Sequence, residues 1–397
     1  MRMVELSVDG ILLLLALPVA LCCAYLGLAT LLSGRIAMPR PSARSLRFDV
    51  IVPAHNEAAV IACCVASLRR LDWPADRFRV TVIADNCNDL TAEIARAAGA
   101  RVLLRRDSCR RGKGHALQFA FRSSCREQWA DAVVVVDADS EVSGNLLEAC
   151  AARIERGAAA VQVHYGVLNP AASWRTRLLT IAQAAFHIVR SRARERLHLS
   201  CGIRGNGWCV THALLRKVPY EAFTLAEDVE YGLDLGLAGY RVQYAGEASV
   251  LGEMVSNPRN ARRQRQRWEG GRFALRRLRT LQLLRATVRK RSAVCFDLAL
   301  DLLVPPLAQI ALMTTALIVG AAIALWWYPR LTTLLWLGLA CAAVLSLYVL
   351  RGWQLSGTGA RGLADLAHAP AFVLWKVVTL ARRDDSREWE RTERERP

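Results

Sequence analysis

Short apolar runs alternate with helical patterns from Phe48 to about Tyr165, and this alternation limits the possible folds more than any other feature of the sequence. The pattern predicts strands at 48–53, 79–84, 101–104, 132–136 and 160–163, and helices near 57–70, 90–98, 113–126 and 143–156. Residues 133–136 are apolar throughout, as in a strand whose two faces are both covered. The pattern therefore indicates an α/β domain with a mostly parallel sheet.

Polar side chains follow the ends of three of these predicted strands. They are His55, Asn56 and Glu57 after the first, Asp85 and Asn86 after the second, and Asp137 and Asp139 after the fourth. Parallel sheets bind ligands beyond the carboxyl ends of their strands, so we expect these side chains to gather at a binding site. No GxGxxG pattern follows the first strand, which disfavours a dinucleotide cofactor.

Asp137 and Asp139 end an apolar strand, where uncompensated charge is unfavourable. Two carboxylates this close repel each other unless a cation lies between them. Hard oxygen ligands at this spacing suit Mg²⁺ or Mn²⁺, with substrate phosphates completing the coordination shell. A simple turn with an aspartate cap for the helix near 143–156 is the alternative interpretation.

Three further segments carry groups that suit phosphate and sugar chemistry. Lys113 lies between two glycines at a predicted helix start, where backbone amides and a lysine can bind a phosphate. Glu227 and Asp228 open another helical stretch, and a carboxylate there either accepts a proton or complements the helix dipole. In 264–268 (QRQRW) an arginine for phosphate adjoins an indole for a sugar ring, although a basic helix beside a membrane is the alternative.

The composition combines positive charge with high hydropathy. Lys plus Arg is 53 and Asp plus Glu is 35, giving a formal net charge of +18, and the mean hydropathy is +0.19. This combination excludes a disordered chain, a collagen-like fibre and an ordinary cytosolic enzyme, and it suits a membrane protein with a large polar domain. The twelve cysteines form no CxxC pair, so we expect reduced thiols and no zinc site.

Three apolar runs, 11–32, about 302–328 and 331–350, are long enough to cross a bilayer. Arginines follow the first run and acidic residues precede it, which puts the amino terminus outside and residue 35 onward in the cytoplasm. A cleaved signal peptide is the alternative for 11–32. Pro305 and Pro306 predict a kink at the start of the second span. We expect a multi-pass protein of the inner (plasma) membrane with a cytoplasmic α/β domain.

Residues 259–291 carry 13 basic side chains and one acidic side chain. Their place before a span indicates contact with anionic membrane lipids, and some of the arginines are candidates for a phosphorylated substrate. Nucleic-acid binding is the alternative, but no recognition module supports it. The predicted organisation is an anchor at 1–34, the α/β domain at 35–258, basic helices at 259–294, two spans at 295–350, an interfacial or re-entrant helix at 351–381 and a charged tail at 382–397.

The motifs in this order resemble the membrane-integrated family-2 glycosyltransferases, the group of the cellulose, chitin, hyaluronan and poly-N-acetylglucosamine synthases. The matching segments are VIVPAHNE (50–57), ADN (84–86), GKG (112–114), DADS (137–140), GNGW (205–208), AEDVEYGLDL (226–235) and QRQRW (264–268). The resemblance implies a GT-A fold, which is a nucleotide-binding α/β sandwich. The sequence departs from the family pattern at Ala226, where threonine is usual, and in its single predicted amino-terminal span, where some synthases have two or more.

The resemblance also implies a role for each matching residue. The nucleotide pocket would be lined by Pro53, Asn56 and Glu57, with Asp85 near the base and Lys113 near the diphosphate. Mg²⁺ or Mn²⁺ would be held with the diphosphate by Asp137 and Asp139, and Asp228 beside Glu227 would be the general base. The diphosphate and the acceptor sugar would be bracketed by Gln264, Arg267 and Trp268, and the acceptor site would be roofed by 205–208, which includes Asn206.

Together these features predict an inverting transferase that uses a nucleotide-diphosphate sugar and forms a β-linked product. The acceptor is expected to be a glycan, which implies polysaccharide extension coupled to export. Glycosylation of a membrane lipid or polyprenyl phosphate is one alternative. A catalytically silent membrane scaffold that keeps the fold is the other.

Overall fold

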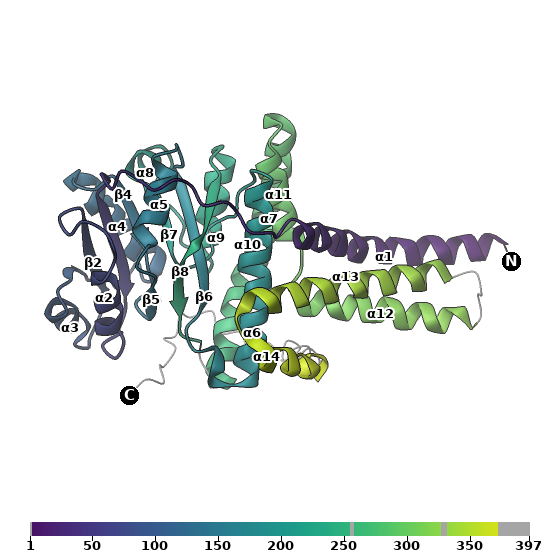
Figure 1. Cartoon of the computed structure of the whole chain (residues 1–397). Coiled ribbons are helices and arrows are strands. Elements are labelled where there is room, and N and C mark those ends of the chain that lie inside the picture. Colours follow the sequence, from purple (N-terminus) through teal and green to yellow (C-terminus); the bar gives the residue numbers. More distant parts are fainter. Residues whose placement is uncertain (1, 255–257, 327–331, 372–397) are drawn as a thin grey trace. The chain divides into compact units, whose positions relative to one another are not determined.

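The computed structural model describes residues 2–254, 258–326 and 332–371, with side chains left out at 2–13, 15 and 258–268 (Figure 1). The chain divides into two compact units. One, here called the sheet unit, contains Arg35–Thr176 and Arg194–Leu303. The other, here called the helical unit, contains Met1–Gly34, Arg177–Ala193 and the described residues from Val304 onward.

The described part of the sheet unit forms one eight-stranded sheet in the order β3-β2-β1-β4-β7-β6-β8-β5. The strands are β1 (Phe48–Ala54), β2 (Phe78–Asp85), β3 (Arg101–Arg105), β4 (Ala132–Val135), β5 (Ser140–Val142), β6 (Ala160–Val167), β7 (Trp208–Thr211) and β8 (Val242–Gly252). The pairs β1–β2, β1–β4, β2–β3 and β6–β8 are parallel, and β4–β7, β6–β7 and β5–β8 are antiparallel. The five strands expected from the apolar runs are confirmed.

Helices cover both faces of this sheet (Figure 1). One face carries α2 (Ile61–Arg69), α3 (Thr91–Ala97) and α5 (Leu146–Ile154), and the other carries α4 (Lys113–Glu127), α8 (His212–Lys217) and α9 (Glu227–Leu237). In β4, Val134 faces the first layer while Val133 and Val135 face the second. Each buried valine contributes about 1.5–3 kcal/mol, which explains a strand that is apolar at every position.

The sheet unit continues into two helices, α10 (Pro258–Lys290) and α11 (Ala293–Leu303). The second of these was expected to belong to a membrane span with a kink at Pro305 and Pro306. Instead α11 ends at Leu303, and Pro306 is the N-cap of α12 (Leu307–Leu325). Proline lacks an N–H donor and restricts the residue before it, so two in succession end one helix and start another.

The helical unit contains α1 (Arg2–Leu31), α12, α13 (Thr332–Ser356), α14 (Gly359–Asp365) and a short 3₁₀ turn, Leu366–His368. Among the described residues, α12 and α13 are long and apolar enough to cross a membrane, while the apolar helix at Ala16–Leu31 is shorter. Core helices of soluble proteins meet the same criterion, so a multi-pass topology stays a prediction. The predicted interfacial helix at 351–381 is described only to residue 371, and the predicted tail at 382–397 lies outside the described residues.

Residues 177–193 were expected within the α/β domain but belong to the helical unit. They contain most of the helix α6 (Trp174–Ala184), a π-helical turn at Ala185–Val189 and the start of α7 (Arg190–Arg196). Ile181, Ala185 and Val189 recur every four residues and are buried. The Tyr348 hydroxyl of α13 donates to the Ala185 carbonyl oxygen at 2.7 Å, inside the π-helical turn. Packing against α13 therefore makes this insertion part of the helical unit.

Candidate active site

Lys113 is the centre of a charged cluster at the carboxyl edge of the sheet. It is the first residue of α4, directly after Gly112, whose φ of 113° suits glycine. The Lys113 Nζ lies 2.7 Å from Asp137 Oδ1 and 3.4 Å from Glu227 Oε1. It also donates to the Gly205 carbonyl oxygen at 3.3 Å. Lys113, Asp137 and Glu227 are called the Lys113 cluster below.

The charges of this cluster change the protonation of its members. Burial disfavours the charged form of Lys113, but the carboxylates of Asp137 and Glu227 outweigh it and raise the lysine pKa. Burial raises the pKa of Glu227 to about 7, with Lys113 opposing the shift. Burial likewise raises the pKa of Asp228, again opposed by Lys113. One ammonium group thus faces three carboxylates, and the site retains negative charge.

Asn206 connects this cluster to the turn that follows β4. Its Oδ1 accepts a hydrogen bond from the Asp137 amide at 3.0 Å, and its Nδ2 donates to Ser140 Oγ at 2.7 Å. The side chain is fully buried. Both ends of the amide are therefore occupied by protein groups. The side chain thus joins the loop before β7 to the turn that carries Asp137 and Ser140, and contact of Asn206 with substrate stays a prediction.

Trp208 does not have the position expected for a residue that roofs an acceptor site. It begins β7 and is only 1% exposed, within the core between the sheet and the helices of the second layer. Its ring packs edge-on against Phe121 and stacks on Tyr220. The glycines before it, Gly205 and Gly207, have φ of 85° and 70°, so the segment is a tight loop that ends in a core strand.

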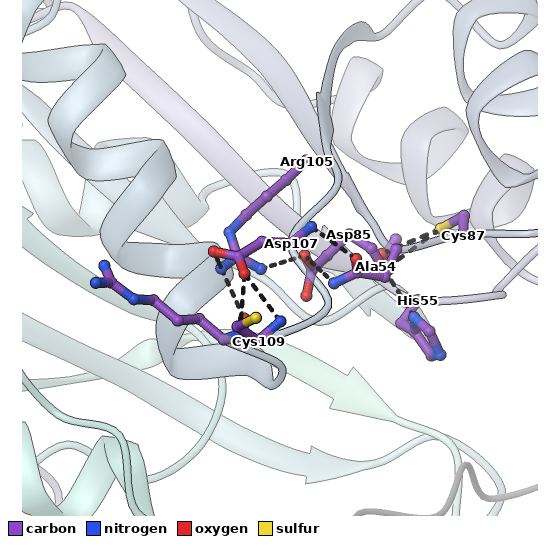
Figure 2. A network of polar contacts seen from close by, with 9 residues as sticks. Ala54, His55, Asp85, Cys87, Arg105, Asp107 and Cys109 are labelled. Carbon is purple, nitrogen blue, oxygen red and sulfur yellow. Dashed lines mark hydrogen bonds and ion pairs between the residues drawn. The ribbon is translucent and has the colours of Figure 1, made fainter.

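A second charged centre lies at the same edge, where β2 and β3 end (Figure 2). Asp85 Oδ1 lies 2.6 Å from Arg105 Nη1, and both side chains are 8% exposed. Asn86 Nδ2 donates to Asp85 Oδ1 at 3.0 Å, and the His55 Nδ1 lies 2.7 Å from the Asp85 carbonyl oxygen. Arg105 also donates to the Arg110 carbonyl oxygen at 2.6 Å. Burial raises the pKa of Asp85, and Arg105 opposes that shift.

Arg105 was missed by the sequence analysis. The parallel register of β2 and β3 puts Asp85 opposite Arg105, so their proximity depends on strand pairing. A basic residue at the end of an apolar run was the only available signal. Arg105 also forms an ion pair with Asp107 at 3.1 Å, and it thereby holds the loop that leads to Lys113.

The residues after β1 shape the turn beside this second centre. Asn56 has a φ of 55°, and its Oδ1 accepts from the Asn88 amide at 2.9 Å. The Glu57 amide donates to Thr91 Oγ1 at 2.8 Å. Pro53 lies within β1. Contact of these residues with a nucleotide stays a prediction.

The QRQRW segment lies in α10, but the side chains of Gln264, Arg267 and Trp268 are outside the described residues. Three positions after Trp268, a Cβ at Gly271 would lie 3.0 Å from the Ala226 Cβ. The helix therefore passes directly beside the residue that precedes Glu227. This close approach also explains a small residue at position 226.

The residues fit a divalent cation that brings further ligands with it. Among the described residues, no group of three or more His, Cys, Asp or Glu could hold a metal ion. Asp137 and Asp139 supply two carboxylates at most, and one oxygen of Asp137 is paired with Lys113. Mg²⁺ is commonly bound by one or two carboxylates and completed by substrate phosphates. The arrangement suits Mg²⁺ or Mn²⁺ bound together with a diphosphate.

Residues 46–271 match the family described as "Glycosyltransferase like family 2", which is more than half of the chain. The chain therefore belongs to this family, and the predicted class, a family-2 glycosyltransferase, is confirmed. A mannosyltransferase from Pyrobaculum calidifontis, solved in complex with GDP-Man and Mn²⁺, has a TM-score of 0.51 at 18% identity and covers 86% of this chain and 98% of its own. That likeness confirms the GT-A-like fold.

Two curated relatives differ in the products that their names state. A β-monoglucosyldiacylglycerol synthase of Trichormus variabilis is 28% identical over 231 residues, which is 56% of this chain and 48% of the relative. "Probable glucomannan 4-beta-mannosyltransferase 1" of Arabidopsis thaliana is 24% identical over 261 residues, 62% of this chain and 47% of the relative. The chain thus spans about half the length of these relatives.

Proposed function

We propose that this chain transfers a sugar from a nucleotide-diphosphate sugar to an acceptor hydroxyl with inversion, so that a β-glycosidic bond forms. The Lys113 cluster carries this proposal. It combines a cation for a diphosphate with the adjacent carboxylate of Asp228 for an acceptor proton, which are the two groups that such a transfer requires.

Asp228 takes the proton from the acceptor hydroxyl, whose oxygen forms a bond to the anomeric carbon as the bond to the diphosphate breaks. The raised pKa of Asp228 makes its carboxylate a stronger base than an exposed aspartate. Lys113 and Arg267 stabilise the negative charge of the departing diphosphate. The nucleotide lies at Asp85 and at the turn that contains Asn56 and Glu57, and Trp268 stacks on the acceptor sugar.

Asp137 and Asp139 hold Mg²⁺ or Mn²⁺ when the donor is present. The bound cation would offset the charge of the diphosphate. The complex of the related fold with GDP-Man and Mn²⁺ supports this proposal. Asp137 would be one of the residues that hold the cation, and Lys113, which lies 2.7 Å from it, would bind the diphosphate.

The acceptor is proposed to be a growing polysaccharide, with synthesis coupled to export through the inner membrane. The QRQRW pattern and the apolar helices α12 and α13 support it. Transfer of one sugar to a membrane lipid is the second candidate, supported by the diacylglycerol-glycosylating relative. Both candidates place the acceptor at a bilayer.

The exposed side of α10 supports contact with anionic membrane lipids. Four large apolar side chains are 45–79% exposed there: Phe273, Leu278, Leu281 and Val288. Arg277, Arg285 and Arg289 are exposed on the same helix. Apolar side chains among arginines suit the boundary between headgroups and acyl chains.

The test uses the purified full chain with several nucleotide sugars and Mg²⁺ or Mn²⁺, and it measures nucleotide release and product mass. A ladder of masses indicates a polysaccharide, whereas a single added sugar on a lipid indicates the second candidate. Nucleotide release that stops with a chelator supports the metal. If no donor is cleaved with either acceptor class, the catalytic proposal is wrong and a silent scaffold remains.

A further inference from the structure

Asp301, in α11, forms ion pairs with arginines from three separate elements of the sheet unit. Its carboxylate lies 2.9 Å from Arg194 Nη2 in α7, 3.7 Å from Arg204 Nη2 in the loop before β7, and 3.3 Å from Arg272 Nη2 in α10. Arg272 also donates to the Asp301 carbonyl oxygen. Asp301 and Arg204 are 8% and 6% exposed. These four residues are called the Asp301 cluster.

The loop that carries Arg204 leads directly to the Lys113 cluster. The Asn206 amide donates to the Arg204 carbonyl oxygen at 3.1 Å, and the Asn206 side chain in turn accepts from the Asp137 amide. Gly205, between them, accepts from Lys113 Nζ. The position of Arg204 thus sets where the loop presents its contacts to Lys113 and Asp137.

The helix that carries Arg272 leads to the other side of the site. Arg272 follows Trp268 by four residues in α10, and Gly271 beside it lies against Ala226. The same aspartate therefore holds the loop at Asp137 and the helix that approaches the Glu227–Asp228 pair.

Charge explains why the loss of Asp301 should disturb the cluster. Three buried or half-buried guanidinium groups share Asp301, and the second aspartate of α11, Asp297, forms an ion pair with Arg194 at 2.8 Å. Burial lowers the pKa of Arg204 to about 10, and Asp301 opposes that shift. Removing one partner of a buried charge network leaves the other charges uncompensated, so the elements that carry them move apart.

We propose that Asp301 is a positioning residue for sugar transfer, which holds the Arg204 loop and α10 together around the Lys113 cluster. It touches no reacting atom in the proposed chemistry. The proposal rests on the proposed function for its effect on catalysis, but the structural part of it does not.

The experiment compares Asp301→Asn with Asp301→Glu and with Glu247→Gln, in the full chain. Glu247→Gln is the matched control, because it neutralises a carboxylate that pairs with the buried Arg153 in the same unit, outside the Asp301 cluster. Hydrogen–deuterium exchange is followed in peptides that contain Gly207, whose amide donates to the Val135 carbonyl oxygen at 3.0 Å. The kcat and the KM for the nucleotide sugar are measured in parallel.

We expect Asp301→Asn to speed exchange in the 201–208 segment and to lower kcat by about 10–100-fold, the usual effect of losing a residue that orients a site. Asp301→Glu should restore much of both, because it keeps the charge. Glu247→Gln should leave exchange in that segment, and kcat, close to the wild-type values.

Equal effects of Glu247→Gln and Asp301→Asn on exchange at 201–208, or unchanged exchange there in Asp301→Asn, would overturn the proposal. If Asp301→Asn does not fold, Arg204→Lys replaces it, since lysine keeps the charge but loses the planar fork of arginine. The same outcomes then apply. If the wild type transfers no sugar at all, the exchange result still decides the positioning role, and only the proposed function fails.

Discussion

Two charged centres lie at the carboxyl edge of one sheet, yet they differ in charge balance and exposure. At the Asp85–Arg105 centre the Arg105 guanidinium pairs with Asp85, both side chains being 8% exposed, and also with the more exposed Asp107. At the Lys113 cluster one ammonium meets Asp137 and Glu227, whose side chains are 30% and 14% exposed, with Asp228 beside them. The central ion pair of the first centre is closed to solvent. The second is open and negatively charged.

We infer from this difference that the first centre stabilises the fold and that the second carries the chemistry. A buried ion pair with additional hydrogen bonds and a second carboxylate, Asp107, holds two strand ends and the loop between Arg105 and Lys113 in place. A cluster with excess carboxylates has raised pKa values at Glu227 and Asp228, and it can accept a proton or a cation. Variants at the first centre should therefore lower stability more than activity, and variants at the second should lower activity more than stability.

The largest effect is expected for Asp228→Asn. Transfer should fall by about 10²–10⁴-fold, because asparagine cannot accept the acceptor proton. Nucleotide affinity, measured by calorimetric titration, should stay near the wild-type value, since Lys113 and Asp137 remain. Asp234→Asn is the control, because this residue is on the same helix and pairs with Arg279 at 3.2 Å. Equal losses in both variants would show a general defect of α9.

A smaller loss is expected for Asp139→Asn, which removes one proposed metal ligand while keeping the side-chain size. Activity should fall by more than the roughly 10–100-fold typical of residues that only orient a ligand. Binding of Mn²⁺, followed by its electron paramagnetic resonance signal with and without nucleotide, should require nucleotide in the wild type and weaken in the variant. The exposed Asp76→Asn should change neither. Normal Mn²⁺ binding in Asp139→Asn would mean that Asp139 is part of a simple turn and is not a metal ligand.

Stability should respond at the other centre. Arg105→Met leaves Asp85 buried without its partner, and the free energy of unfolding should fall by about 3–5 kcal/mol. Adding Asp85→Asn should recover part of the loss, as urea denaturation can measure. Lys113→Met should cost less stability and more activity, because the carboxylates around it are more exposed. A similar stability loss in Lys113→Met would remove the contrast between the two centres.

The smallest effect is a shift in pH dependence. The pKa of Glu227 is about 7 in the folded state against an ordinary 4.5, so folding favours its neutral form. The resulting stabilisation is complete below about pH 4.5 and is lost as the pH rises through about 7. The kcat/KM should increase with pH as the coupled Glu227–Asp228 pair ionises. In Lys113→Met the increase of the residual kcat/KM should occur at a higher pH than in the wild type, because Lys113 lowers the pKa of both Glu227 and Asp228. An unchanged pH profile would contradict an interaction of Lys113 with these two carboxyl groups.

The sequence alone determined the alternation of strands and helices in the sheet unit and the carboxylates at the strand ends. Apolar periodicity depends only on which faces are buried, so 133–136 was recognisable as a doubly covered strand. Strands β5, β7 and β8 were missed because their runs are short or polar. The motif residues Lys113, Asp137 and Glu227 were predicted separately, on helix starts and a strand end, and the structure brings them together.

Only the tertiary structure decided which groups meet. Arg105 faces Asp85 through strand register, Asn206 is enclosed behind Asp137, Asp301 gathers arginines from three elements, and 177–193 leaves the sheet unit for the helical one. Each contact joins residues distant in sequence, and local patterns carry no information on such partners. A buried charge needs a partner wherever the fold can supply one, and that place is set by packing of the whole unit.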